Sequence, residues 1–271
     1  MNLKYAAVTG NVPEIHAAGL FLLVAFLAIS LLLRKAFCSW LCPIGTLSEW
    51  VWQGGQALFG RSWRLPRWID IPLRGAKYIL LGLFVYAVGT MSAEAIAAFI
   101  ASPYGLVADV KMLDFFRRMG TTAAVVIAAL LLLSVPIQNF WCRYLCPYGA
   151  MVGLVALVSP LRIRREADVC IDCAKCAKAC PSLLPVDRVT TVRSAECTAC
   201  LLCVEACPAA GALQLSAPRK RTVPAWAVAA AMAIIFFGVT GYARLAGHWH
   251  SELPDAVYFE LIPKAQSLGH P

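Results

Sequence analysis

Long apolar stretches alternate with basic, polar segments along the 271-residue chain. Four stretches carry no charged side chain and cover residues 17–33, 78–93, 120–141 and 222–243. Each approaches the roughly 20 residues that a helix needs to cross the hydrocarbon core of a bilayer. The pattern predicts about four membrane-spanning helices, of which the stretch at 78–93 is the weakest. Composition agrees, because 14% of the residues are charged, whereas soluble domains carry about a quarter.

The first apolar stretch is predicted to be retained. A cleaved signal peptide has basic residues before its apolar core and small residues at its cleavage site. The segment before residue 17 instead carries Glu14 and His16, and no A-x-A site follows. We therefore expect a membrane helix at 17–33.

The basic residues are distributed unevenly between the segments that join the apolar stretches. Segments 34–77 and 142–221 hold 18 of the 24 Lys and Arg residues. Lys and Arg accumulate on the cytoplasmic side of membrane proteins, so these segments are predicted to be cytoplasmic and both termini periplasmic. The net charge of +9 then reflects topology and contact with anionic lipid rather than nucleic-acid binding. Seven of the eight tryptophans lie near the predicted inner interface, as in an aromatic belt: Trp40, Trp50, Trp52, Trp63, Trp68, Trp141 and Trp226.

Eight cysteines form two copies of the motif C-x2-C-x2-C-x3-C-P. Three closely spaced thiolates bind three irons of one [4Fe–4S] cluster, and in two-cluster bacterial ferredoxins the fourth cysteine of each run ligates the other cluster. Structural zinc typically uses two separated pairs instead, so the motif predicts two [4Fe–4S] clusters. The expected ligand sets are Cys170, Cys173, Cys176 with Cys207, and Cys197, Cys200, Cys203 with Cys180.

Residues 162–216 resemble the bacterial two-cluster ferredoxin domain. The resemblance implies short strands around Ile163 and at 213–215, with a short helix after each cysteine loop. A cytoplasmic location suits these thiols, because reducing conditions disfavour structural disulfides. The proline-flanked segment 181–185 departs from the pattern where the first helix would continue.

The other four cysteines form a second repeat, C-x3-C-P, at Cys38/Cys42 and Cys142/Cys146. Two predicted helices separate the copies, so both emerge on the inner side. The spacing i, i+4 would place each pair on one helical face, and the four thiols could converge below the bilayer surface. Shorter apolar stretches, 44–59 and 148–161, follow the motifs and are expected to lie in the interface.

Three roles for these four thiols stay open on the sequence alone. They could be small core residues or free thiols. They could form a thiol–disulfide relay, which nearby Arg34, Lys35 and Arg143 would favour by lowering thiol pKa values. They could also bind a metal or a third iron–sulfur cluster, although the sequence assigns none.

Paired C-x3-C-P motifs followed by a two-cluster ferredoxin segment resemble the membrane polyferredoxins of the NapH and NosR type. The resemblance covers about residues 20–216. It implies electron transfer, with membrane quinol as a candidate donor, because these families are associated with electron supply to periplasmic nitrate and nitrous-oxide reductases. Relatives with these motifs occur in copper-oxidase assembly. The chain departs from the NosR type in lacking a large flavin-binding domain, and from the NapH type in continuing into a fourth helix.

Other chemistry-bearing residues carry weaker indications. The histidines His16, His248, His250 and His270 all lie on the predicted outer side, where interfacial polarity is favoured over a haem or copper site. Quinol oxidation would need a proton acceptor near an interface, but no quinone motif, Rossmann glycine pattern, P-loop or hydrolase triad is present. The acidic residues near the predicted interfaces are Glu49, Asp70, Glu94, Asp109 and Asp114.

These observations predict an α-helical membrane protein with an inserted small α+β ferredoxin-like domain. The expected parts are a membrane domain at 1–161, a cytoplasmic ferredoxin domain at 162–216, a fourth transmembrane helix at 217–246 and a periplasmic tail at 247–271.

The predicted function is electron transfer in the bacterial inner membrane, between a quinol or cytoplasmic donor and a periplasmic respiratory reductase system. The chain would be an electron-transfer component of an oxidoreductase system, with quinol oxidation as its candidate enzymatic part. The alternative is a redox-sensing or metal-cofactor assembly factor for a respiratory enzyme. Expected partners are membrane lipid and donor and acceptor proteins in a membrane complex.

Overall fold

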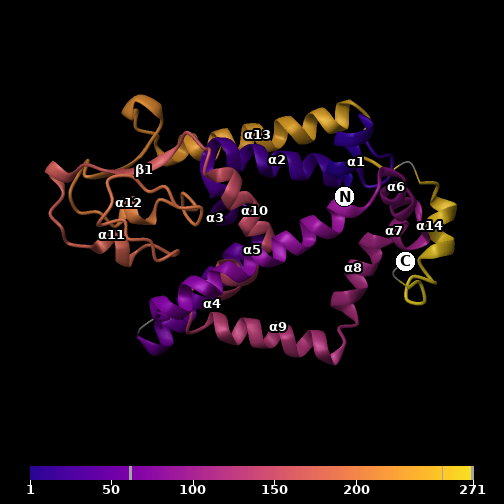
Figure 1. Cartoon of the computed structure of the whole chain (residues 1–271), viewed down its shortest axis with the longest axis horizontal. Coiled ribbons are helices and arrows are strands. Elements are labelled where there is room, and N and C mark those ends of the chain that lie inside the picture. The colour runs from indigo at the N-terminus through magenta and orange to yellow at the C-terminus, as the bar shows by residue number, and fades with distance from the viewer. Residues whose placement is uncertain (61–62, 252, 270–271) are drawn as a thin grey trace. The chain divides into compact units, whose positions relative to one another are not determined.

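The computed structural model describes residues 1–60, 63–251 and 253–269 and is mainly helical (Figure 1). Three segments are long and apolar enough to cross a membrane: Ala17–Trp40, Arg67–Thr90 and Ala225–Leu245. A fourth crossing is present if the bent pair Ala108–Arg117 and Thr121–Ser134, with 76° between its helices, counts as one span.

Two of the four predicted spans have different bounds from the helices found in the structure. Helix α5 (Arg67–Thr90) begins well before the predicted stretch at 78–93, because Asp70 and Lys77 are buried inside the protein instead of marking a loop. Helix α9 (Thr121–Ser134) is too short to span alone. It ends just before Val135-Pro136, where proline disfavours helical backbone in the preceding residue.

The bounds of the other elements are as follows. The helices are α1 (Asn2–Thr9), α2 (Ala17–Leu33), α3 (Phe37–Trp40), α4 (Pro43–Phe59), α6 (Ala93–Ala101), α7 (Pro103–Leu106), α8 (Ala108–Arg117), α10 (Pro147–Ala156), α11 (Lys175–Lys178), α12 (Leu202–Glu205), α13 (Ala225–Leu245) and α14 (Asp255–Leu261). Three 3-10 turns, η1 (Arg34–Ala36), η3 (Ala167–Val169) and η4 (Pro218–Lys220), and one π-helical turn, η2 (Trp141–Leu145), complete the helical elements of the described chain. The strands are β1 (Arg162–Arg165) and β2 (Leu213–Ser216).

The chain divides into two compact units. The first comprises Met1–Val24, Leu83–Ala128 and Gly238–Pro271. Polar contacts join its distant segments: the Lys4 ammonium donates to the Gly89 carbonyl at 2.7 Å, and a ring nitrogen of His16 lies 2.8 Å from the Gly105 carbonyl.

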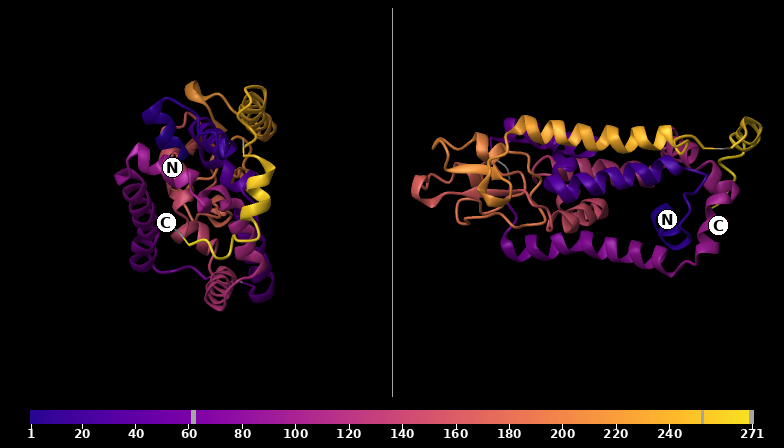
Figure 2. Two further views of the ribbon diagram at one scale, coloured as in Figure 1. Left: turned by 90° about the vertical axis from the view of Figure 1, so that its right-hand side faces the viewer. Right: turned by 90° about the horizontal axis from the view of Figure 1, so that it is seen from above.

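The second unit comprises Ala25–Gly82 and Ala129–Phe237 and contains all twelve cysteines. Its apolar core joins the ends of membrane helices to the ferredoxin-like segment, since Ile29 and Phe37 belong to the same buried cluster as Ile163 and Leu215. Helices α2 and α13 lie side by side in both views (Figures 1 and 2), and the Phe26 and Phe236 rings stack with centroids 6.2 Å apart.

The predicted ferredoxin elements are present in this unit. Strands β1 and β2 pair antiparallel with Ile163 opposite Leu215. Helices α11 and α12 each begin inside a cysteine loop and lie close together (Figure 1). The strand and helix positions expected from the ferredoxin resemblance are therefore confirmed.

Candidate electron-transfer site

The two ferredoxin-type cysteine loops have the same backbone conformation. In the first, Asp172 and Ala174 flank Cys173 with φ of 51° and 54°. In the second, Ala199 and Leu201 flank Cys200 with φ of 50° and 65°. Left-handed backbone is uncommon outside glycine, so its recurrence at equivalent positions shows one loop shape used twice.

The second loop and Cys180 surround one apolar cavity. Cys180, Cys197, Cys200 and Cys203 all line it, together with Ile163, Leu184, Val186 and Val192 among others. Backbone N–H groups of Leu202 and Leu184 donate toward the thiols of Cys200 and Cys180. Four sulfur donors, backbone N–H groups and an apolar wall are the environment in which proteins hold iron–sulfur clusters, so these residues fit such a group.

The other four cysteines of the ferredoxin motif lie nearer the solvent. Cys173 is exposed, Cys170 and Cys207 are half-buried, and Cys176 is buried. Cys176 lies close enough to Cys207 for their charges to interact. At the rim, Arg165 donates a hydrogen bond of 3.2 Å to Asp172.

The alternative occupant of such cysteines is a structural zinc ion. Zinc needs four ligands, with sulfur at about 2.3 Å from the metal. Within the described part of the chain, no group of three or more His, Cys, Asp or Glu side chains is placed to hold a single metal ion.

Each C-x3-C-P motif straddles two helices, so the expectation of one continuous helical face is wrong. Cys38 lies in α3, whereas Cys42 has extended backbone (φ −73°, ψ 115°) and caps α4. Cys146 has nearly the same backbone (φ −71°, ψ 105°) and caps α10. The following proline causes both breaks, because it disfavours helical backbone in the residue before it and favours the first position of a helix.

The four C-x3-C-P cysteines nevertheless line a single cavity of about 230 Å³. Gly45 permits this close packing, because a Cβ there would lie 2.2 Å from the Cys38 carbonyl oxygen. A Cβ on Gly149 would make only ordinary contact with the Cys146 sulfur, at 3.5 Å. The Gly149 N–H donates to that sulfur at 3.2 Å.

The thiol of Cys142 is not activated for exchange. Burial raises its pKa to about 12, and the other three thiols of the cavity add to this effect. Reactive cysteines have lowered pKa values. Lys35 lowers this pKa, as expected, but burial and the other thiols outweigh its effect, so the net shift is upward.

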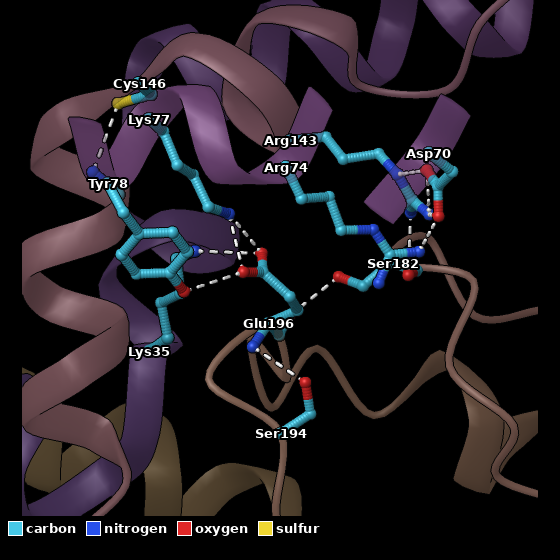
Figure 3. A network of polar contacts seen from close by, with 11 residues as sticks. Lys35, Asp70, Arg74, Lys77, Tyr78, Arg143, Cys146, Ser182, Ser194 and Glu196 are labelled. Carbon is cyan, nitrogen blue, oxygen red and sulfur yellow. Dashed lines mark hydrogen bonds and ion pairs between the residues drawn. The ribbon is translucent and has the colours of Figure 1, made fainter. Parts of the chain in front are cut away.

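Glu196, next to Cys197, is held by two buried lysines (Figure 3). The Lys77 ammonium lies 2.6 Å from both carboxylate oxygens, the Lys35 ammonium lies 3.7 Å away, and the Tyr78 hydroxyl donates at 3.2 Å. Burial raises the pKa of Glu196, but Lys35 and Lys77 outweigh this and hold it below its ordinary value. The second cysteine loop is thus attached to α5 through an ionised carboxylate.

Asp70 forms a second buried network. Arg143 donates to both of its oxygens at 2.9–3.1 Å, the Tyr144 hydroxyl donates at 2.6 Å, and Arg74 also pairs with it. Arg143 also donates to the Ser182 carbonyl at 2.7 Å, and the Ser182 hydroxyl donates to the Glu196 carbonyl at 2.7 Å. The two networks therefore meet at Ser182, two residues after Cys180 (Figure 3).

Arg34, in the 3-10 turn η1 that follows α2, fixes the second cysteine loop. Its fully buried guanidinium donates to the carbonyls of Ser194 at 2.6 Å and Leu161 at 3.4 Å. The sequence analysis used Lys77 only to count positive charge, used Arg34 and Arg143 also as cations near the C-x3-C-P thiols, and did not single out Glu196. The sequence held one indication that Glu196 belongs to the site: it directly precedes the predicted ligand Cys197.

Among the other acidic residues and histidines that the sequence singled out, one, Glu49, lies beside the cysteines. Glu49 lines the thiol cavity and accepts a hydrogen bond of 3.3 Å from Gln53. Glu94 and Asp109 are exposed and Asp114 is partly exposed in the first unit. His248 and His250 line a separate cavity of about 730 Å³ there, and His248 stacks on Phe21. His270 lies outside the described residues.

Two family models match the chain. One, a 4Fe–4S binding domain, covers residues 15–66 and 119–166, which contain both C-x3-C-P motifs. The other, a 4Fe–4S dicluster domain, covers residues 162–208. YccM of Escherichia coli (strain K12), whose name assigns it provisionally to electron transport, is 54% identical over 276 residues, which cover 100% of the chain and 77% of YccM.

The chain belongs to the YccM family. The expected resemblance to NosR-type proteins is also confirmed: the regulatory protein NosR of Pseudomonas aeruginosa is 33% identical over 59% of the chain and 22% of NosR. MauN of Methylorubrum extorquens, a methylamine utilization ferredoxin-type protein, is 31% identical over 64% of the chain and 56% of MauN. No solved structure matches the chain. Its candidate spans and matched domains make this YccM-family chain a membrane protein with [4Fe–4S]-binding domains.

Proposed function

We propose that the chain relays single electrons between a quinol or cytoplasmic donor and a periplasmic respiratory reductase system. Two [4Fe–4S] clusters would be bound by Cys170, Cys173, Cys176 with Cys207, and by Cys197, Cys200, Cys203 with Cys180. Such clusters, when bound, accept and release one electron each. The names of YccM and MauN, an electron transport protein and a ferredoxin-type protein, support this role.

One observation carries the proposal: the cavity of the second ligand set lies directly against the C-x3-C-P cavity. Both cavities are lined by Pro181, Ser182 and Thr198. The ferredoxin-type ligands and the thiols at the ends of membrane helices therefore line adjoining cavities. This arrangement favours electron exchange between the membrane and the ferredoxin segment over a freely diffusing carrier.

The two ligand sets differ in exposure, and this difference indicates which set a soluble partner would approach. The set with Cys180 is mostly buried against the membrane helices, whereas the set with Cys173 is nearer the solvent. Solvent exposure and hydrogen bonding to sulfur tune cluster potentials. A soluble cytoplasmic partner would exchange electrons with the exposed set.

The proposed placement is the inner membrane of a bacterium, with residues 162–216 in the cytoplasm and both termini in the periplasm. It rests on the distribution of Lys and Arg. Partners would be a donor and an acceptor protein in a membrane complex.

Inverted membrane vesicles that contain the chain test the proposal. Anaerobic addition of a reduced quinol should decrease the broad visible absorption of the clusters, and vesicles without the chain should show no such change. The variant Cys173→Ser should lower the iron content by up to about four atoms per chain and remove part of the absorption. Clusters that stay oxidised in excess quinol, while soluble donors reduce them, would exclude quinol as the donor.

The alternative function is maturation or redox sensing for a respiratory enzyme. It is supported by the four C-x3-C-P thiols, which all line one cavity. Under this alternative, deletion of the gene would abolish cofactor loading of a partner enzyme while quinol leaves the clusters oxidised. Under the relay, the partner enzyme is fully loaded but receives no electrons.

A further inference from the structure

Three arginines of the ferredoxin-like segment, Arg162, Arg164 and Arg193, gather at its small sheet and are called the arginine cluster below. Arg162 and Arg164 lie two positions apart in β1, so their side chains leave the strand on the same face. Ile163 between them enters the core. Arg193 directly follows the segment along the other edge of β1, where the Val192 N–H donates to the Ile163 carbonyl at 2.9 Å.

No carboxylate of the described residues pairs with the arginine cluster. Within residues 1–60, 63–251 and 253–269, none of its side chains forms an ion pair, and neither does the buried guanidinium of Arg34 beside it. Burial lowers the pKa of Arg162, and the charges of Arg34, Arg193 and Arg164 lower it further. The Nε atom of Arg164 is buried without an acceptor in the same part of the chain. The described chain therefore supplies no counterion for these cations, which repel one another.

The arginine cluster lies where apolar helices end. The Arg162 guanidinium donates to the Leu157 carbonyl, just after α10, at 3.1 Å. The Ser159 hydroxyl donates to the Leu32 carbonyl at 3.1 Å, which joins this segment to the last turn of α2. Helix α2 belongs to a segment long and apolar enough to cross a membrane. The side chains of Leu32, Leu157 and Val158 are exposed, so an apolar surface adjoins the cations.

We propose that the arginine cluster binds the phosphate of an anionic phospholipid headgroup. Guanidinium groups bind phosphate oxygens through paired, charge-assisted hydrogen bonds, and basic pockets beside membrane helices bind anionic headgroups. The acyl chains of the same lipid lie along the exposed side chains of Leu32 and Val158. A water-soluble anion or an acidic protein surface would leave these apolar side chains uncovered, so the observations favour a lipid. The site is independent of the route that electrons take.

Native mass spectrometry of the full-length protein in a neutral detergent tests the site, with phosphatidylglycerol and phosphatidylcholine as probes. The wild-type protein should bind phosphatidylglycerol more tightly. Arg162→Gln/Arg164→Gln should weaken phosphatidylglycerol binding by roughly 30-fold, because two cations next to an anionic headgroup are lost, and should leave phosphatidylcholine binding unchanged. The control Lys175→Gln/Lys178→Gln removes the same charge from exposed positions of α11 and should keep the wild-type preference.

A further variant and a soluble competitor keep the test decisive if the double variant folds poorly. Arg193 is exposed, so Arg193→Gln leaves the packing intact and should weaken phosphatidylglycerol binding by roughly fivefold. Glycerol phosphate, which carries the phosphate without acyl chains, should displace no lipid at equal concentration. Equal affinities for the two lipids, or an unchanged preference in both arginine variants, would overturn the lipid site and favour an acidic protein as partner. Displacement by glycerol phosphate would overturn it in favour of a soluble anion.

Discussion

At the scale of single residues, buried charges attach the ferredoxin-type loops to the membrane helices. Glu196 pairs with Lys77 and Lys35, Asp70 pairs with Arg143, and Arg34 donates to backbone carbonyls beside the second loop. Buried ion pairs add little net stability compared with apolar packing, but loss of one partner is costly. These pairs therefore fix geometry: they hold the backbone beside Cys180 and Cys197 against the C-x3-C-P cavity.

Lys77→Met should destabilise the second cluster loop. The substitution leaves the buried Glu196 carboxylate without its nearest cation, and removal of one partner of a buried pair costs roughly 3–5 kcal/mol. We expect a lower temperature for thermal loss of cluster absorption in detergent. The control Arg188→Ala removes a pair whose arginine side chain is 79% exposed, and such pairs contribute about 0–1 kcal/mol. Equal effects of the two variants would contradict the anchoring role of Lys77.

The residue scale is also where sequence analysis was weakest. The cysteine patterns alone named all twelve thiols, because ligand spacing is local in the chain. Lys77 and Glu196 are 119 positions apart, and nothing local connects them. The pKa of Cys142 was misjudged for a related reason: its burial depends on elements far away in the sequence.

At the scale of elements, the decisive feature is the helix break at each Cys-Pro step. It turns α3 into α4 and η2 into α10, and it places both members of each cysteine pair on the cavity. The hydrophobic pattern predicted the apolar helices after these breaks, and the ferredoxin resemblance predicted β1 and β2. The pattern missed the early start of α5 because its first turns carry charges that tertiary contacts neutralise.

Gly45→Ala should disrupt the first Cys-Pro turn. The new Cβ would lie 2.2 Å from the Cys38 carbonyl oxygen, so backbone must shift, and overpacking of this kind typically costs about 1–3 kcal/mol. Gly54→Ala, in the same helix, meets no atom within 4 Å and should be neutral or stabilising by up to about 1 kcal/mol. Thermal melting and iron content of both variants check this, and an undisturbed Gly45→Ala protein would refute the close packing.

At the scale of the whole molecule, the number of crossings decides the topology. Both termini lie on one side only if the chain crosses the membrane an even number of times. The three long apolar segments alone would place the termini on opposite sides, whereas counting the bent pair α8–α9 as a span gives four. The predicted topology thus depends on that pair crossing as one unit.

Fusions of alkaline phosphatase, which is active only in the periplasm, should test this topology. We expect activity for fusions before Asn2 and after Gly269, and none for a fusion at Gly211, in a turn of the ferredoxin segment. A cytoplasmic fluorescent reporter at the same three positions should give the reverse pattern. Opposite results at the two termini would show that α8 and α9 do not span together.

The central claim is that electrons pass between the C-x3-C-P cavity and the ferredoxin-type clusters. The most direct measurement follows the clusters by rapid-freeze paramagnetic resonance after reduced quinol is mixed with the wild-type chain or Cys38→Ser/Cys142→Ser in nanodiscs. The account predicts reduced ferredoxin-type clusters in the wild type, and the same clusters present but still oxidised in the variant. Reduction of both proteins at the same rate would contradict it.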